Sequence, residues 1–131
     1  MLFRSRFRVA EIAEHHFCRA EASHLRLVTR GRLQQIAFLR CWTRKEAYIK
    51  AVGDGLYLSL NQFQVTLLPR HPARLVQIDN DTNAVLEWTL EDLELAPGYV
   101  GAICYRASTR QIALHPPQQP RDLLSAVGAA W

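Results

Sequence analysis

The chain has 131 residues, a length that suits one domain with one modest hydrophobic core. Apolar residues make up 49% and charged residues 21%, which is typical of a soluble globular protein. No apolar run approaches the roughly 20 residues that a membrane span requires. The net charge of +4 favours acidic or phosphorylated partners only mildly.

The three cysteines, Cys18, Cys41 and Cys104, are widely spaced and form no CxxC pair. Such spacing indicates reduced thiols in a core rather than a disulfide framework or a zinc site. We therefore expect a cytoplasmic protein that does not act at a membrane.

The first part of the chain has the apolar spacing of helices. This spacing predicts helices over residues 8–17, 21–29 and 32–52. The third of these contains no proline or glycine, and it is followed at once by Gly53 and Gly55. Because glycine tolerates positive φ, these residues are expected to end the helix.

From residue 56 onward the apolar period changes to two, which indicates strands. We predict strands over residues 56–60, 62–67, 74–79, 84–95 and 99–105, with a short one at 112–114. Prolines at 116, 117 and 120 separate a domain over residues 1–115 from a linker and short terminal helix over 116–131. Helices followed by antiparallel strands predict an α+β fold, with the helices packed on the sheet.

The predicted helix over residues 32–52 carries charges where a core face is expected. Stepping 100° per residue places Lys45 in the middle of the main apolar arc, whereas Glu46 and Lys50 lie on a narrow polar strip. A buried charge needs a partner, a metal or a ligand to offset its desolvation. The ordinary explanation is an i,i+4 pair between Glu46 and Lys50, with Lys45 extending its ammonium to water.

Residues 42–56 read Trp-Thr-Arg-Lys-Glu-Ala-Tyr-Ile-Lys-Ala-Val-Gly-Asp-Gly-Leu. This run resembles the second signature of 4′-phosphopantetheinyl transferases of the surfactin-synthetase-activating type. That signature has Trp or Phe, Ser or Thr, any residue, Lys-Glu-Ala/Ser, two residues, Lys, and then Gly-x-Gly-Leu. Upstream, the run from Phe17 to Glu21 is similar to the Phe-Ser-x-x-Glu segment of the same family, and the likeness spans roughly residues 8 to 106.

The resemblance implies transfer of phosphopantetheine from coenzyme A to a serine of an acyl or peptidyl carrier protein, with Mg²⁺. Glu46 matches the metal-binding glutamate of the family, which can also help to deprotonate the attacking serine. Lys45 and Lys50 match two lysines that contact coenzyme A phosphates and neutralise the leaving group. These residue types suit the reaction, because a phosphoryl transition state needs positive charge and a hard cation needs carboxylate oxygens.

The chain also departs from the family pattern. The other metal ligands of the family come from a Gly-x-Asp-x-Glu strand about a dozen residues before the first predicted helix, and no such strand stands here. The sequence therefore resembles the C-terminal half of a two-half fold, and we interpret it as a truncated member. An apolar surface left open in this way favours self-association or binding of the missing N-terminal half.

Two other functions remain open from the sequence. The first is a non-catalytic domain of the same fold that docks a carrier protein or another partner. The second is a basic nucleic-acid-binding module, which the charge permits but no aromatic-basic pattern supports. We expect no nucleic-acid partner.

Overall fold

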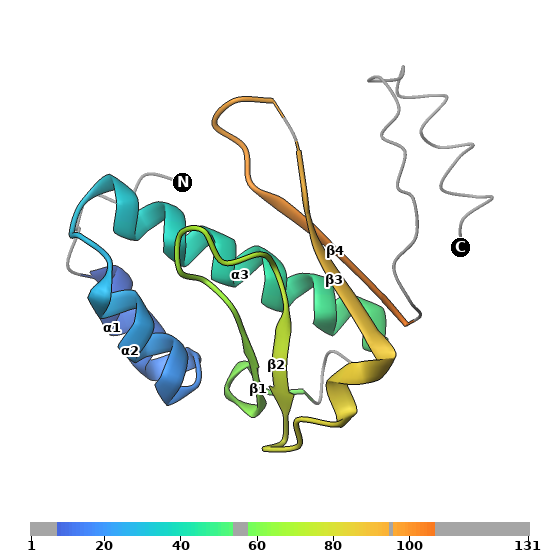
Figure 1. Ribbon diagram of the computed structural model, residues 1–131. Helices are drawn as coiled ribbons and strands as arrows, with labels where there is room; N and C mark the ends of the chain where they lie inside the picture. Colours follow the sequence, from blue (N-terminus) through green and yellow to red (C-terminus); the bar gives the residue numbers. More distant parts are fainter. Residues whose placement is uncertain (1–7, 54–57, 95, 107–131) are drawn as a thin grey trace.

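The computed structural model describes residues 8–53, 58–94 and 96–106, and it shows three helices followed by two β-hairpins (Figure 1). The helices are α1 (Arg8–His16), α2 (Arg19–Leu27) and α3 (Arg32–Val52). The strands are β1 (Phe63–Val65), β2 (Leu75–Ile78), β3 (Trp88–Leu93) and β4 (Gly101–Arg106), with 3₁₀ turns η1 (Leu60–Gln62) and η2 (Ala84–Glu87). The predicted α+β class is confirmed.

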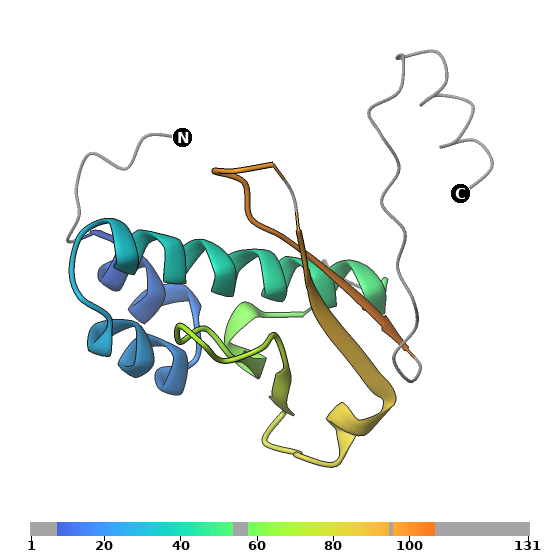
Figure 2. The same cartoon turned by 45° about the horizontal axis from the view of Figure 1, so that its top comes forward.

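Helix α3 is the element on which the others pack. It has the bounds predicted from the sequence, and it ends where Gly53 adopts φ 84° and donates its N–H to the carbonyl of Ile49 at 3.3 Å. Helices α1 and α2 lie beside its first half, while the β3–β4 hairpin crosses its second half (Figures 1 and 2). Side chains at the middle of α3 can therefore reach both the helices and the hairpins.

The strands pair antiparallel, as predicted, but they form two separate two-stranded sheets. In the first sheet Phe63 lies opposite Ile78, and the register shifts by one residue after Gln64. In the second sheet the pairing runs without interruption from Trp88 opposite Arg106 to Leu93 opposite Gly101. The second hairpin is thus a regular ribbon laid across α3.

Two of the predicted strands are corrected by the structure. The described part of the strand predicted over residues 56–60 contains no strand, and the chain instead enters η1, where the N–H of Ser59 donates to Oε1 of Gln62 at 2.9 Å. The strand predicted from residue 84 begins only at Trp88. There, Oδ1 of Asp81 accepts the N–H of Asn83 at 2.8 Å, and this Asx turn leads the chain into η2. The strand predicted at 112–114, the linker and the terminal helix lie outside the described residues.

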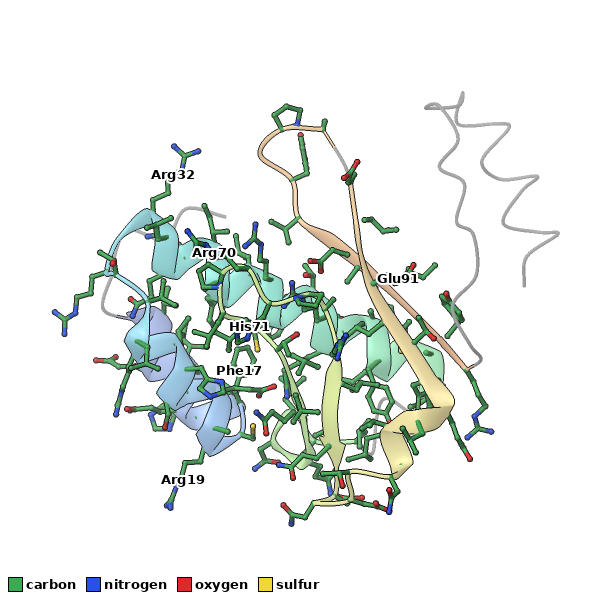
Figure 3. The ribbon with its side chains drawn as sticks, viewed as in Figure 1. Phe17, Arg19, Arg32, Arg70, His71 and Glu91 are labelled. Carbon is green, nitrogen blue, oxygen red and sulfur yellow. The ribbon has the colours of Figure 1, made fainter. Side chains whose placement is uncertain are left out.

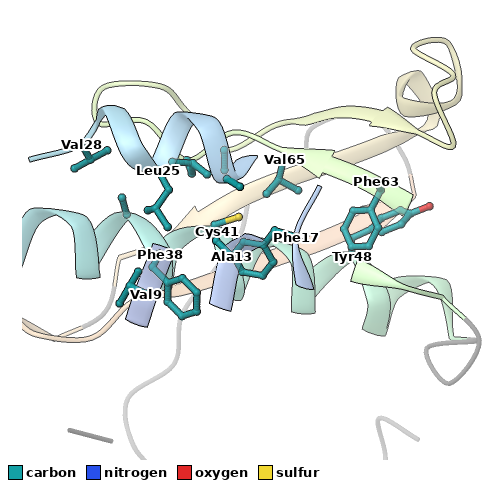
Figure 4. Close-up of a cluster of buried hydrophobic side chains, with 14 of the residues drawn as sticks. Val9, Ala13, Phe17, Leu25, Val28, Phe38, Cys41, Tyr48, Phe63 and Val65 are labelled. Carbon is teal, nitrogen blue, oxygen red and sulfur yellow. The ribbon is translucent and has the colours of Figure 1, made fainter. Parts of the chain in front are cut away.

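One hydrophobic core joins the helices to both hairpins (Figure 4). Phe17 stacks on Phe38 with ring centroids 5.4 Å apart, and Tyr48 packs on Phe63 at 4.7 Å. Phe17 lies at the centre of this packing, between the helices and β1 (Figure 3). Trp42 on α3 is 38% exposed, so α3 is not buried all round. None of the described helices is long and apolar enough to cross a membrane.

Candidate functional site

The signature lysine Lys45 is fully buried and forms an ion pair with Glu21, which is also fully buried. Its Nζ atom lies 2.7 and 2.9 Å from the two carboxylate oxygens of Glu21 and 2.6 Å from the carbonyl oxygen of Phe63. An ammonium group has three N–H donors, and three acceptors surround this one. The predicted burial of Lys45 is confirmed, and the alternative in which its ammonium reaches water is wrong.

Glu21 joins three elements at one point. Its Oε1 accepts the N–H of Cys18 at 3.1 Å, which closes the first turn of α2 on itself. Its Oε2 accepts the N–H of Val65 in β1 at 2.7 Å, and both oxygens accept from Lys45 in α3. These hydrogen bonds offset the free-energy cost of removing the Glu21 carboxylate from water.

Arg44, the variable position of the signature, is a second buried cation on α3. Its Nε and Nη2 atoms donate to the two carboxylate oxygens of Asp92 in β3 at 2.9 and 2.6 Å. Its Nη1 donates to the carbonyl of Thr66 at 2.6 Å, and the guanidinium is only 2% exposed. A bidentate pair of this kind fixes orientation as well as distance. Arg44 therefore holds α3 against both hairpins.

Glu46 and Lys50 lie on another face of α3, where a cleft of about 310 Å³ separates this helix from β4. Trp42, Thr43 and Ala47 complete the wall on α3. The opposite wall is Gly101, which has no side chain, and Ala102, which has only a methyl group, so the ribbon can pass close to the helix. The structure thus brings two of the three predicted site residues to one cleft and places Lys45 in the core instead.

The cleft offers one carboxylate and one ammonium in accessible positions. Glu46 is half-buried and Lys50 is exposed. Among the residues that the structure describes, the two form no ion pair, so the ordinary i,i+4 explanation is not borne out. A carboxylate and an ammonium that pair with no described residue suit a ligand that carries both a cation and phosphate oxygens.

The described residues contain no group of three His, Cys, Asp or Glu side chains that could hold a metal ion. Of the described residues that line the cleft, Glu46 is the acidic one. Magnesium is commonly held by one or two carboxylates together with substrate phosphates and water, so one carboxylate fits such an ion only when a phosphorylated ligand supplies further oxygens.

The three cysteines are free thiols, as expected. Burial raises the pKa of Cys18, Cys41 and Cys104, and the nearby Glu21 carboxylate adds to this effect for the first two. Because only the thiolate is a good nucleophile, these protonated thiols are unsuited to covalent catalysis at neutral pH.

Comparison with known proteins decides the family. A family model described as the 4′-phosphopantetheinyl transferase superfamily matches residues 2–104. The chain belongs to the 4′-phosphopantetheinyl transferase superfamily. The match covers all of the helices and hairpins described above, apart from the last residues of β4.

Two relatives of this superfamily member are 4′-phosphopantetheinyl transferases. The chain is 37% identical over 86 residues to HetI of Nostoc sp., an overlap of 66% of this chain and 32% of the relative. It is 30% identical over 95 residues to gsp of Aneurinibacillus migulanus, an overlap of 72% of this chain and 37% of the relative. The chain thus spans about a third of the length of the curated relatives it matches. No solved structure matches it.

Two features of the site were not predicted from the sequence. Glu21 was recognised only as part of the Phe17–Glu21 resemblance, without a role, and the pairing of Arg44 with Asp92 was not expected at all. The partners are 24 and 48 residues apart in the chain, so no local spacing connects them. The one available signal was the need of a buried Lys45 for a counter-charge.

Proposed function

We propose that this chain takes part in the transfer of phosphopantetheine from coenzyme A to a serine of an acyl or peptidyl carrier protein, with Mg²⁺. One observation carries the proposal: the signature residues Glu46 and Lys50 line the same cleft without pairing with each other. The family membership supplies the reaction class.

In this proposal Lys50 donates to the phosphate oxygens of coenzyme A, whose negative charge rises as the phosphoryl group is transferred. A positioned cation is worth more in the transition state than in the free substrate, and this difference accelerates the reaction. The cleft is at the small end of ligand sites, so it would take the diphosphate region and leave the rest of the cofactor to other surfaces.

Glu46 would supply a carboxylate oxygen to Mg²⁺, which contributes positive charge next to the phosphates when it is bound. The same carboxylate stands ready to accept the proton of the attacking serine, directly or through water. The resemblance also implies that Lys45 contacts the phosphates. Because its three acceptors are internal, that role stays a prediction, and we assign the direct contacts to Glu46 and Lys50.

The proposal is tested by incubating an apo carrier protein with coenzyme A, Mg²⁺ and the chain, and then measuring the intact mass of the carrier. We expect the mass of phosphopantetheine to be added by the wild type and by Glu11→Gln, a control on the exposed surface of α1. We expect Glu46→Gln to slow the addition at least 100-fold while its thermal unfolding is unchanged. No addition by the wild type at stoichiometric amounts would favour the alternative, a non-catalytic domain that binds a carrier protein.

Self-association is a second proposal for the same face of the molecule. Leu39 and Trp42 on α3 are 36% and 38% exposed, and Tyr99 in the β3–β4 turn is 72% exposed. We propose that a second copy of the chain covers these side chains. Sedimentation velocity should then show a dimer or larger species that Trp42→Ser weakens, whereas a monomer at all concentrations would contradict the proposal.

A further inference from the structure

The sequence contains two lysines, Lys45 and Lys50, and the structure gives them opposite environments. One residue turns an α-helix by about 100°, so Lys50 is rotated by about 140° from Lys45, and Glu46 lies between the two. Lys45 is fully buried and Lys50 is exposed. When Lys45 points into the core, Glu46 and Lys50 therefore face the cleft.

We propose that Glu21 is a positioning residue: by holding the ammonium of Lys45 inside the core it sets the rotation of α3 that presents Glu46 and Lys50 to the cleft. Lys45 is then the counter-charge of Glu21 and not a ligand of the phosphates. This inference rests on the proposed function of the cleft. It adds to that function Glu21, the residue that positions Glu46 and Lys50.

The hydrogen bonds of the pair form a closed set. Lys45 gives its three donors to Glu21 and Phe63, while each oxygen of Glu21 accepts one bond from Lys45 and one from a backbone N–H. If Lys45 moved to a phosphate, Glu21 would remain as an uncompensated charge at a fully buried site. The closed set therefore keeps Lys45 out of the cleft.

The hydrogen bonds of Arg44 also fix the rotation of α3. Arg44, the neighbour of Lys45, is fixed to Thr66 and Asp92, so two successive cations anchor one face of α3 to the hairpins. The anchors differ in exposure, because Asp92 is 42% exposed whereas Glu21 is fully buried. Loss of Glu21 should accordingly disturb α3 more than loss of Asp92.

Lysine acetylation followed by mass spectrometry tests the placement directly, since each lysine gives its own peptide. In the folded wild type we expect Lys50 to be acetylated at least 100-fold faster than Lys45, and both to react alike in urea. Coenzyme A with Mg²⁺ should slow the acetylation of Lys50 and leave Lys45 unreactive. Acetylation of both lysines at similar rates in the folded protein would overturn the inference.

Two variants test the positioning role. Glu21→Gln should raise the acetylation rate of Lys45 at least 10-fold and weaken coenzyme A binding at least 5-fold at a temperature where the variant is folded. The double variant Glu21→Met with Lys45→Met removes both charges and puts apolar side chains of similar volume in the core, so α3 should keep its rotation and the variant should bind coenzyme A within 3-fold of the wild type. Glu11→Gln is the matched control and should change neither property.

The outcomes separate this inference from the proposed function. A folded double variant that keeps the wild-type acetylation rate of Lys50 but loses coenzyme A binding 10-fold or more would make Lys45 a ligand and overturn the inference while supporting the cleft. A wild type that binds no coenzyme A would sink the proposed function. The acetylation rates of Lys45 in the wild type and in Glu21→Gln would then decide by themselves whether Glu21 holds that lysine inside.

Discussion

Lys45 and Glu46 are neighbours on α3, yet Lys45 is fully buried against Glu21 whereas Glu46 lines the cleft between α3 and β4. In this chain the signature segment thus divides into one residue that is buried in the core and residues that line the cleft. This division connects the packing of the core to the chemistry of the cleft, and it gives each position a different expected response to substitution.

Removing one partner of the buried pair should destabilise the fold strongly. Glu21→Gln leaves the Lys45 ammonium without a counter-charge, which typically costs roughly 3–5 kcal/mol. The double variant with methionine at both positions should recover most of this loss, because a buried pair replaced by apolar side chains of similar volume is often close to neutral. Urea unfolding of the wild type, Glu21→Met, Lys45→Met and the double variant measures the coupling, and additive effects of the two single substitutions would contradict it.

The Arg44–Asp92 contact should contribute less to the free energy of unfolding than the Lys45–Glu21 pair does. Asp92→Asn removes the charge that accepts from Nε and Nη2 of Arg44, and a hydrogen bond to a charged group is worth about 1.5 kcal/mol at the lower end of its range. We expect that lower end because Asp92 is 42% exposed. Glu94→Gln, an exposed acid just after β3, should stay within about 0.5 kcal/mol of the wild type. Equal effects of the two substitutions in urea unfolding would rule out a special role for Asp92.

The end of α3 depends on a left-handed residue. Gly53 has φ 84°, and no atom of the described residues, its chain neighbours aside, lies within 4 Å of where a Cβ would stand, so an alanine there would be disfavoured by backbone conformation. Gly53→Ala should lower the free energy of unfolding by roughly 1–2 kcal/mol. Gly53→Asn should cost less, since asparagine adopts this conformation more readily. Thermal unfolding of the two variants in the same buffer checks the order.

Alkaline pH should weaken the fold through its thiols. Burial raises the pKa of Cys104 from 9.0 to about 11, so the folded protein holds this proton more tightly than the unfolded chain does. The contribution of this group is fully present below pH 9 and is lost as the pH rises from 9 towards 11. Urea midpoints measured across this window should fall more steeply for the wild type than for Cys104→Ala. Parallel slopes would show that Cys104 does not titrate differently in the two states.

The sequence predicted α3 well because its signals are local. An uninterrupted run without proline or glycine, closed by Gly53, gave the bounds of the helix, and its angular pattern placed Lys45 inside. The identity of its partner could not be predicted in the same way. Glu21 lies 24 residues before Lys45, and only the packing of α2 against α3 and β1 brings their charged groups together.

The strands were predicted less accurately, for a related reason. Leu58 and Leu60 alternate with polar residues, and residues 84–87 begin with the apolar run Ala-Val-Leu, but side-chain hydrogen bonds at Ser59 and Asp81 turn both stretches into 3₁₀ helix. The pattern of apolar residues does not reveal such side-chain hydrogen bonds to the backbone, which compete with strand formation. The cleft formed because the β3–β4 hairpin crosses α3, a tertiary arrangement that strand periodicity does not contain.

In the function proposed above, Glu46 and Lys50 make the cleft between α3 and β4 a site for coenzyme A. Calorimetric titration of coenzyme A into the wild type and into Lys50→Met, each with Mg²⁺, tests it most directly. We expect the wild type to bind and Lys50→Met to bind at least 10-fold more weakly, a loss of about 1.4 kcal/mol, with its thermal unfolding unchanged. Equal affinity of the two proteins, or no binding by the wild type, would contradict the claim.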